Sequence, residues 1–226
     1  MTAKVIESLE SIKSFNMFED LALYFIGGTA LSYYLNHRIS EDIDIISTEP
    51  LPYKQIISII SSIGGEKLRD ENAVALRMAG LVPYEYMLKF NLDGVKLEFF
   101  RASTPLQIRI IMDAKISKYS EASLRILDVK SIAKLKLIAL LSRNKSRDLF
   151  DFKVILEKNV LSIEEILDIT SQTKHKITTL EGLYTFIKKI EEPKDDEVVY
   201  LDEDRPINLD FVDIKAETLN TIKNIS

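Results

Sequence analysis

The chain has 226 residues, is 46% hydrophobic and carries a formal net charge of −5, with few glycines and prolines. This composition is typical of a folded globular protein that is long enough for one large domain or two small ones. The absence of cysteine and the presence of only two histidines exclude disulfides, thiolate chemistry and a histidine zinc cluster, and they leave magnesium as the natural metal.

The N-terminal segment predicts an amphipathic helix over residues 5–18. Apolar side chains recur there at helical spacing, at Val5, Leu9, Ile12, Phe15 and Phe18. The first residues lack the uninterrupted apolar segment of a signal peptide, and no stretch approaches the ~18 apolar residues of a membrane span. We therefore expect a cytoplasmic protein that has no membrane partner.

A short apolar run is followed by two glycines. Residues 24–26 are β-prone, Gly27 and Gly28 interrupt them, and apolar residues then recur at helical spacing over residues 29–35. The predicted order is strand, glycine turn and helix. Glycines let a backbone approach a ligand without a Cβ in the way, and the positive end of the following helix suits a triphosphate. Thr29 is a candidate N-cap or phosphate ligand.

The next predicted strand, over residues 42–46, carries two acids on one face. Asp42 and Asp44 alternate with isoleucines, so both carboxylates leave the same face while the isoleucines enter the core. Like charges at this spacing repel each other, and Mg²⁺ suits such a pair because it binds carboxylate oxygens together with waters and substrate phosphates. A lone Gly-Gly is usually a turn and a lone D-x-D is usually a solvated strand face. Their occurrence one short helix apart favours a metal and nucleotide site.

These motifs resemble a known family. G-G-T-A-L at 27–31, followed by H-R-x-S-x-D-I-D at 37–44, is similar to the nucleotidyltransferase family of AbiEii/AbiGii-type toxins, a branch of the polymerase-β-like nucleotidyltransferase superfamily. The wider superfamily usually shows Gly-Ser before its D-x-D, and Gly-Gly-Thr is similar to the toxin branch. A second match lies at 133–151, and the two matches together cover well under half of the chain.

The resemblance assigns roles to individual residues. It implies that Asp42 and Asp44 are catalytic metal ligands. The nucleotide-binding residues that it implies in this part of the chain are Gly27, Gly28, Thr29 and Ser40. Arg38 is a candidate for additional neutralisation of phosphate charge, and the alternative is that it is a surface cation.

The segment from 53 to 100 predicts a helix and three strands. Isoleucines at helical spacing from Ile56 to Ile63 predict a helix that ends at Gly64-Gly65. Residues 73–78 and 84–92 alternate as strands do. Asn91-Leu92-Asp93-Gly94 is a hairpin turn signal that leads into a strand over residues 95–100.

Glu98 is the candidate third carboxylate. It shares one face of the last predicted strand with Lys96, and polymerase-β-like enzymes need a third acid on a central strand as a catalytic metal ligand. The alternative is an exposed glutamate that pairs with Lys96 or with a neighbouring strand. Asp93, in the turn, is the weaker candidate. The family frequently has aspartate at this position, so the resemblance does not define the geometry with which Glu98 would bind a metal ion.

Beyond Pro105 the pattern becomes helical, and no further strand is predicted. Helices are expected over 108–116, 127–143, 148–158, 163–171 and 180–190. We therefore expect residues 1–105 to form a nucleotidyltransferase α/β domain and residues 106–226 to form a helical domain with an acidic C-terminal segment. The expected fold class is α+β, in which a polymerase-β-like core of mixed sheet and helices precedes an all-helical module.

The second match, K-L-I-A-L-L-S-R-N-K-S-R-D-L-F-D, runs from Lys136 to Asp151. Lys136 and Arg143 lie two helical turns apart and so point the same way. The resemblance implies that this lysine, Arg143 and the R-D-x-x-D cluster of Arg147, Asp148 and Asp151 bind the nucleotide. The alternative is that Arg147 and Asp151 pair at i,i+4 on a helix surface, that Asp148 is favoured by the helix dipole, and that Lys136 is a surface cation.

The charge is unevenly distributed along the chain. Residues 191–210 contain nine acids and two bases, whereas residues 1–190 sum to +2 and the basic window of residues 130–158 sums to +5. The basic window is a candidate footprint for phosphate or RNA. The acidic stretch is expected to be a solvated loop, with contact to a partner as the alternative.

These features predict an enzyme that transfers a nucleoside monophosphate from an NTP to a hydroxyl and releases pyrophosphate, with two Mg²⁺ ions held by Asp42, Asp44 and Glu98. The resemblance implies a toxin of a toxin–antitoxin or phage-defence system, with RNA, in some members tRNA, as acceptor and an antitoxin as partner. A small cationic acceptor is the competing prediction, because antibiotic nucleotidyltransferases share the superfamily core and acidic residues at 191–204 would attract a polycation. A non-catalytic nucleotide sensor is the alternative from another class, against which the retained carboxylates argue.

Overall fold

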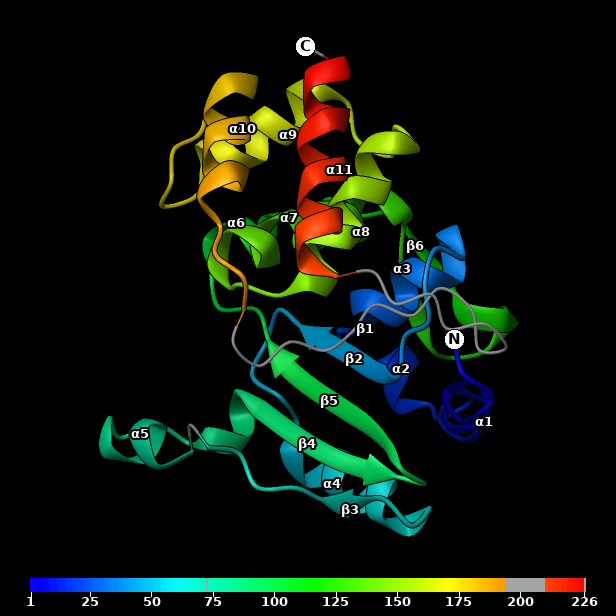
Figure 1. Cartoon of the computed structure of the whole chain (residues 1–226). Helices are drawn as coiled ribbons and strands as arrows, with labels where there is room; N and C mark the ends of the chain where they lie inside the picture. The colour runs from blue at the N-terminus through cyan, green and yellow to red at the C-terminus, as the bar shows by residue number, and fades with distance from the viewer. Residues whose placement is uncertain (72, 194–209, 226) are drawn as a thin grey trace. The chain divides into compact units, whose positions relative to one another are not determined.

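The computed structural model describes residues 1–71, 73–193 and 210–225. The chain divides into two compact units. Unit 1 comprises residues 1–34 and 40–128, and unit 2 comprises residues 35–39 and 129–226. Figure 1 labels most of the helices and strands of both units.

Unit 1 contains a mixed sheet, which has seven strands in the described part of the chain. The strands are β1 (Leu23–Ile26), β2 (Asp42–Ser47), β3 (Glu66–Lys67), β4 (Met87–Leu92), β5 (Val95–Arg101), β6 (Ile116–Lys118) and β7 (Arg125–Leu127). Their order across the sheet is β3-β4-β5-β2-β1-β7-β6. β2 runs parallel to β5 and β1 runs parallel to β7, whereas the other neighbours are antiparallel. β2 is therefore a central strand, with β1 and β5 on its two sides.

The helices of unit 1 connect and flank these strands. They are α1 (Ala3–Ile12), α2 (Met17–Asp20), α3 (Gly27–Leu35), α4 (Tyr53–Ser62), α5 (Ala73–Met78) and α6 (Pro105–Met112), with 3-10 turns at Pro83–Glu85 and Tyr119–Glu121. The single helix expected over 5–18 is wrong, because the chain turns after Ile12 and starts again as α2. Ser14 and Asn16 lie in this break, and both residue types favour turns over helix interiors.

Two local predictions are confirmed. The order strand, helix and strand is found as β1, α3 and β2, and both glycines lie in the first turn of α3. The hairpin between β4 and β5 turns at Asp93 and Gly94, which have φ of +53° and +87°. Two successive positive φ angles are what a type I′ turn requires, and Asp-Gly is among the sequences that supply them most readily.

The strand expected over residues 73–78 is wrong. Residues 73–78 form the helix α5, because alanine, leucine, arginine and methionine are good helix formers. The buried residue of this helix is Ala73, so the apolar alternation does not reflect burial in the sheet.

The chain also contains strands beyond Pro105, contrary to expectation. β7 pairs with β1, with Tyr24 opposite Arg125, and β6 pairs with β7 at the edge of the sheet. Both strands have three residues, which is too short to show a period of two in the sequence. The compact units consequently divide at Asp128, later than the boundary expected near residues 103–110.

Unit 2 is helical throughout its described residues. Its helices are α7 (Val129–Ser142), α8 (Ser146–Glu157), α9 (Ile163–Ser171), α10 (Leu180–Lys189) and α11 (Phe211–Asn224). α7 packs against α8 and α9, and α11 packs against α8 and α10. The fully buried side chains include Ile132, Leu137, Phe152, Ile155, Leu183, Ile187 and Ile214.

The helices expected over 163–171 and 180–190 are found almost as predicted, whereas α11 was not predicted. Its buried residues Phe211, Ile214, Thr218 and Ile222 follow helical spacing, which is the signal that would have revealed it. Most of the acidic stretch, residues 194–209, lies outside the described residues. None of the helices in the described ranges is long and apolar enough to cross a membrane.

Candidate functional site

Three acids of unit 1 lie on one face of neighbouring strands. β2 pairs with β5 so that Asp42 is opposite Lys96 and Asp44 is opposite Glu98. The alternate residues Ile43 and Ile45 are fully buried, which confirms that the acids of β2 leave the other face. We call Asp42, Asp44, Lys96 and Glu98 the carboxylate face. The register thus brings the predicted third acid directly beside Asp44.

The start of α3 lies against the carboxyl group of Asp44. Gly27 has φ of +83°, and a Cβ placed on it would lie 2.0 Å from Asp44 Oδ2. A glycine is therefore required at residue 27 both for its backbone conformation and for the close approach of the carboxylate. Gly28 is buried in the same turn. The N–H groups of a first helical turn have no partner within the helix, so this turn is suited to an anion.

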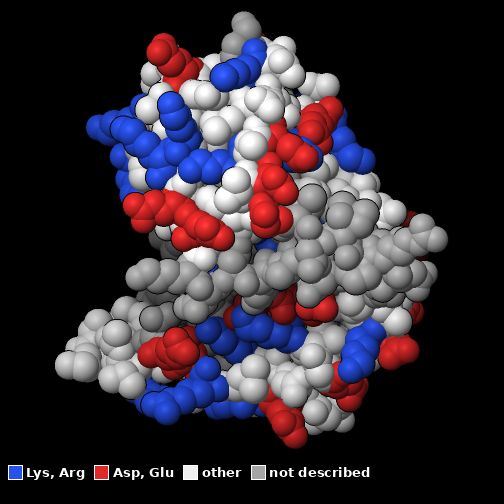
Figure 2. Space-filling view, viewed as in Figure 1, with Lys and Arg blue, Asp and Glu red and all other residues white. Residues whose placement is uncertain are grey.

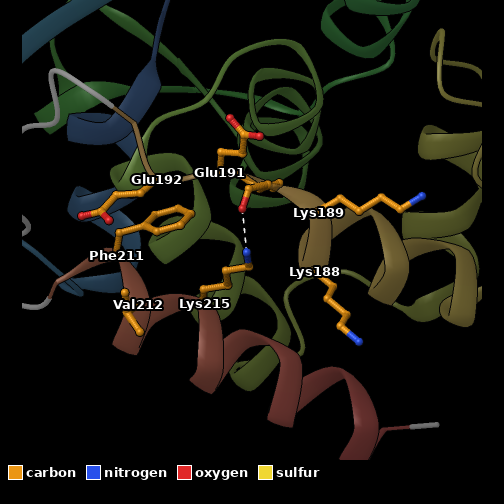
Figure 3. A pocket seen from close by; sticks show the side chains of 8 residues that line it. Lys188, Lys189, Glu191, Glu192, Phe211, Val212 and Lys215 are labelled. Atoms are coloured by element: carbon orange, nitrogen blue, oxygen red, sulfur yellow. Dashed lines mark hydrogen bonds between the residues drawn. The ribbon is translucent and has the colours of Figure 1, made fainter.

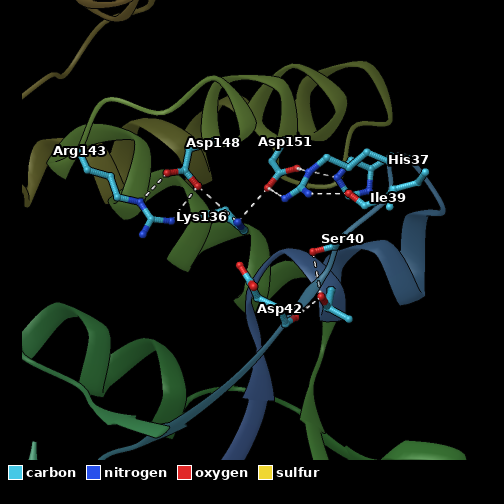
Figure 4. Close-up of polar contacts among 10 residues, drawn as sticks. His37, Ile39, Ser40, Asp42, Lys136, Arg143, Asp148 and Asp151 are labelled. Carbon is cyan, nitrogen blue, oxygen red and sulfur yellow. Dashed lines mark hydrogen bonds and ion pairs between the residues drawn. The ribbon is translucent and has the colours of Figure 1, made fainter. Parts of the chain in front are cut away.

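Thr29 joins α3 to the beginning of β2. It is fully buried, and its Oγ1 lies 2.8 Å from Ser40 Oγ and is hydrogen-bonded to the carbonyl oxygen of Asp42. A carbonyl oxygen can only accept, so Thr29 donates to Asp42 while it shares a second hydrogen bond with the Ser40 hydroxyl (Figure 4). The predicted N-cap role is wrong, because Thr29 is the third residue of the helix. Thr29 and Ser40 instead position Asp42.

Glu98 also forms ion pairs with lysines, as the alternative interpretation of this residue predicts. Its Oε1 lies 3.0 Å from Lys96 Nζ on the same strand and 3.8 Å from Lys89 Nζ on β4. Lys89 is shared with Asp70, from which it lies 3.5 Å away. The third acid therefore stands beside Asp44, as the metal-site interpretation requires, and is paired with lysines, as the alternative requires.

The donor set of the carboxylate face fits one hard cation. Asp42 and Asp44 present carboxylates at i and i+2 on one strand face, and Mg²⁺ typically takes one or two carboxylates and fills its shell with water and phosphate oxygens. Among the residues that the structure describes, no three acidic or histidine side chains gather closely enough to form a metal cluster of their own. The role of Glu98 as a ligand therefore stays a prediction.

The second predicted motif forms a buried charge cluster within unit 2. We use this name for His37, Arg38, Lys136, Asp148 and Asp151 together with Arg143, whose side chain is 60% exposed and pairs with Asp148 at the edge of the cluster. Figure 4 shows the labelled side chains of the cluster converging on the two aspartates. Asp151 is fully buried. The Arg38 guanidinium donates to it from Nε at 2.6 Å and from the NH2 nitrogen at 3.0 Å, and Lys136 Nζ lies 2.9 Å away.

Asp148 occupies the other half of the buried charge cluster. Arg143 donates to it from Nε at 2.6 Å and from its NH2 nitrogen at 3.2 Å, and Lys136 Nζ lies 3.3 Å from Asp148 Oδ1. Lys136 and Arg143 thus point the same way, as their spacing predicted. Burial raises the pKa of Asp148, but the charges of Lys136 and Arg143 outweigh burial and lower it. Both aspartates are therefore ionised, because the same balance holds the pKa of Asp151 well below its usual value.

His37 completes the cluster. Its Nε2 lies 2.7 Å from Asp151 Oδ1, which leaves the buried Nδ1 without a hydrogen-bond partner in the described structure. Burial lowers the pKa of His37 more than the neighbouring Asp151 raises it, and the charges of Arg38 and Lys136 lower it further. The imidazole is therefore neutral, donates from Nε2 to the carboxylate and leaves Nδ1 deprotonated.

The burial of Asp151 excludes one interpretation of the motif, which is the ion pair on a helix surface. Asp151 is inaccessible, so the proposed surface pair of Arg147 and Asp151 is wrong, and Arg38 and Lys136 are not surface cations. Arg147 lies partly exposed on the first turn of α8. Nucleotide binding by these residues stays a prediction, and contact of a ligand with either aspartate would first require ion pairs to open.

The basic window of residues 130–158 is compensated in part by two acids outside it, Glu165 and Glu217. Lys130 and Lys134 pair with Glu165 at 3.1 and 3.3 Å, and Lys153 pairs with Glu217 at 2.5 Å. Lys136 and Arg143 belong to the buried charge cluster. At least five of the eight bases in the window thus form ion pairs, which reduces the positive surface that the sequence predicts.

A different set of cations lies on α10 and on the loop before it. Lys174 and Lys176 lie in the preceding loop and Lys188 and Lys189 lie in the last helical turn. No ion pair connects any of them to an acid within the described residues. We call these four residues the cationic α10 surface. Figure 2 shows Lys and Arg side chains gathered over α10 and the loop before it, and acidic side chains below them. Figure 3 shows Lys188 and Lys189 extending in different directions while Lys215 reaches the carbonyl oxygen of Ile190.

A groove of about 440 Å³ opens beside the cationic α10 surface. Lys174 and Lys189 contribute to its lining, and Leu141 and Phe186 are among its apolar residues. His175 packs against Phe186 with 4.8 Å between the ring centroids, and its Nε2 is hydrogen-bonded to the carbonyl oxygen of Leu141. Lysines beside aromatic rings are the combination that single-stranded nucleic acids bind.

The chain is similar to known proteins in sequence and in fold. The family described as "Nucleotidyl transferase AbiEii toxin, Type IV TA system" matches residues 15–219. The uncharacterized protein aq_aa25 of Aquifex aeolicus (strain VF5) is 29% identical over 160 residues, which span 71% of this chain and 69% of that protein.

Two solved structures from Helicobacter pylori are similar at 18% identity. JHP933 has a TM-score of 0.51, with 100% of this chain and 93% of that chain covered. A "putative nucleotidyltransferase" has a TM-score of 0.54, with 100% and 96% covered. At this identity the likeness shows a shared fold, and it confirms the expected fold class.

Proposed function

Because the chain belongs to the AbiEii family of nucleotidyl transferase toxins of type IV toxin–antitoxin systems, we propose that it transfers a nucleoside monophosphate from an NTP to a hydroxyl group of RNA. The acceptor oxygen forms a bond to the α-phosphorus, and the bond from that phosphorus to the bridging oxygen of the β-phosphate breaks. Pyrophosphate leaves, and the hydroxyl proton passes to solvent. Such transfer depends on positioning and on charge neutralisation more than on covalent chemistry by the protein.

The observation that carries this proposal is the register of β2 against β5. It places Asp44 beside Glu98, and the close approach of Gly27 places the first turn of α3 beside Asp44. Acids and the N–H groups of a first helical turn thus occur next to each other within unit 1. A triphosphate with a bound cation needs both of these features, because its oxygens require donors and its cation requires acids.

The proposed cofactor is Mg²⁺, which Asp42 and Asp44 would hold. When it is bound, the ion neutralises phosphate charge and polarises the reacting phosphoryl group. The backbone of Gly27 and Gly28 would bind phosphate oxygens. Thr29 would keep α3 and the start of β2 in register through its hydrogen bond to Asp42.

RNA as the acceptor is supported by the cationic α10 surface. Lys174 and Lys189 lie beside the groove that contains the ring contact of His175 and Phe186, so phosphates and a base would find complementary groups close together. Binding of this kind weakens steeply with salt, because each neutralised phosphate releases counterions. This surface replaces the basic window as the proposed footprint.

The family assignment also supports an antitoxin as a partner. A small cationic acceptor is the competing proposal, and most of the acidic stretch that favours it lies outside the described residues. A nucleotide sensor without turnover would retain the fold and nucleotide binding and lack transfer.

One experiment separates these functions. The protein is incubated with Mg²⁺, each α-labelled NTP in turn, and either total cellular RNA or a panel of cationic small molecules. We expect label in RNA with the wild type and with the control variant Asp93→Asn, which lies in an exposed turn, and none with Asp44→Ala. Label in small molecules alone would refute the RNA acceptor. Label in neither acceptor, with NTP still bound, would establish the sensor instead.

A further inference from the structure

The carboxylate face carries a lysine that has no part in the reaction as described so far. Lys96 is opposite Asp42, and Glu98 two residues later is opposite Asp44. Residues two apart on a strand share a face, so all four side chains leave the same side of the sheet. The Lys96 ammonium group therefore stands on the face of the three carboxylates, and Lys89 of β4 lies opposite Glu98 beside it.

Lys96 forms an ion pair with one of these acids, Glu98. Its Nζ lies 3.0 Å from Glu98 Oε1. Burial lowers the pKa of Lys96, but the hydrogen bond to Glu98 and the charges of Glu98, Asp42 and Asp44 outweigh burial and raise it. The side chain is 44% exposed, so its ammonium group remains accessible to a ligand from solvent.

Glu98 is meanwhile occupied by lysines. Lys96 and, at 3.8 Å, Lys89 share its Oε1. A metal ion bound by Glu98 would stand next to the Lys96 ammonium group, and the two positive charges would repel each other strongly at such a short distance. Within the described ranges, the structure also contains no cluster of three metal-ligating side chains. Asp42 and Asp44 present two carboxylates at i and i+2 on the neighbouring strand β2, which is a donor pair that suits one divalent ion.

We propose that the carboxylate face binds a single divalent ion, on Asp42 and Asp44, and that Lys96 is the second cation of the site. Glu98 is then a positioning residue that holds the Lys96 ammonium group where it neutralises the charge of substrate phosphates. A lysine binds phosphate as a compact point charge, which is the electrostatic part of what a second metal ion supplies. This inference rests on the proposed function, and it replaces the two-ion arrangement expected from the sequence.

The test counts metal ions. Mn²⁺ is used as the metal, and the number of ions per protein-bound nucleotide is measured by equilibrium dialysis with a non-hydrolysable NTP analogue. We expect one ion in the wild type and two in Lys96→Met, because Glu98 is then free to bind a second ion beside Asp44. Lys96→Arg keeps a cation and should still bind one ion. Lys89→Met is the matched control and should also bind one ion, because Lys89 lies farther from Glu98 and is shared with Asp70.

Transfer activity supplies the second readout. The rate of Lys96→Met should fall at low Mg²⁺ and recover in part at high Mg²⁺, because a second metal ion then replaces the ammonium group. Two ions in the wild type, or one ion in both the wild type and Lys96→Met, would overturn the inference. One ion in the wild type and two in Lys96→Met, without transfer to any acceptor, would support the inference while refuting the proposed reaction.

Discussion

Replacing Gly27 with alanine tests how closely the start of α3 approaches the carboxylate face. A Cβ at this residue would lie 2.0 Å from Asp44 Oδ2 and 2.8 Å from Asp44 Cγ. Non-bonded carbon and oxygen atoms rarely come closer than about 3.3 Å, so the carboxylate must move by roughly 1 Å or more. The variant therefore displaces the acid that is proposed to hold the metal.

The expected loss in the free energy of unfolding of Gly27→Ala has two parts. A positive φ costs an alanine about 1–2 kcal/mol, and overpacking of a well-packed site costs about 1–3 kcal/mol more. Gly64→Ala separates the two parts, because Gly64 has φ of +88° and no neighbouring atom within 4 Å of the added Cβ. The free energy of unfolding should fall by about 2–5 kcal/mol in Gly27→Ala and by about 1–2 kcal/mol in Gly64→Ala.

Urea unfolding measures these stabilities, and Mn²⁺ binding and labelled transfer measure the site. A displacement of about 1 Å at a reacting centre can cost on the order of 100-fold in rate, so Gly27→Ala should lose transfer and bind Mn²⁺ more weakly, whereas Gly64→Ala should retain both. Equal losses of stability in the two variants, together with unchanged Mn²⁺ binding by Gly27→Ala, would refute the close approach.

Four further outcomes are expected. Asp42→Asn should abolish transfer and leave the stability without metal unchanged or raised, because it removes like-charge repulsion; a loss of fold would contradict this. Asp151→Asn should lower the free energy of unfolding by about 3–5 kcal/mol in urea titrations, because it leaves buried cations unpaired; a loss below about 1 kcal/mol would argue against the cluster as a structural element. Lys189→Glu should raise the KM for RNA and leave that for NTP unchanged, whereas an equal effect of Lys130→Glu, whose wild-type lysine pairs with Glu165, would discredit the α10 footprint. The lowered pKa of His37 means that, below its unfolded value of about 6.5, the unfolded chain takes up a proton that the folded chain resists. The free energy of unfolding should therefore fall as the pH decreases below about 6.5, and His37→Gln should reduce that slope.

The local elements of the site could be predicted from the sequence. The strand, helix and strand around Gly27 and Asp42 follow from apolar spacing and from glycine placement, and the hairpin at Asp93-Gly94 follows from the φ angles that this dipeptide adopts. The alternation of acids with Ile43 and Ile45 also predicted which side chains share a face. These features depend on residues close together in the chain, whose preferences act before any tertiary contact forms.

The elements that were predicted wrongly lack such a local signal. β6 and β7 are too short to show a period, and they exist because β1 offers an edge on which β7 can pair. In residues 73–78 the apolar alternation was present, but the segment forms a helix with mostly exposed side chains. A period of two predicts a strand only where a neighbouring strand and a core are available.

The sequence by itself determined the residue types of the site, their faces and their local order. The acid that stands beside Asp44 was decided by the register of β5 against β2, and the contact of Lys89 with Glu98 was decided by the pairing of β4 with β5. Which charged side chains form ion pairs, and which are buried, also depended on the tertiary structure. Glu165 neutralises lysines of the basic window from outside it, and Asp151 lies in a buried cluster where the sequence alone had suggested a surface pair or a nucleotide contact. Charge pairing and burial depend on distances in space, and residues that are 30 or more apart along the chain acquire those distances only when the chain folds.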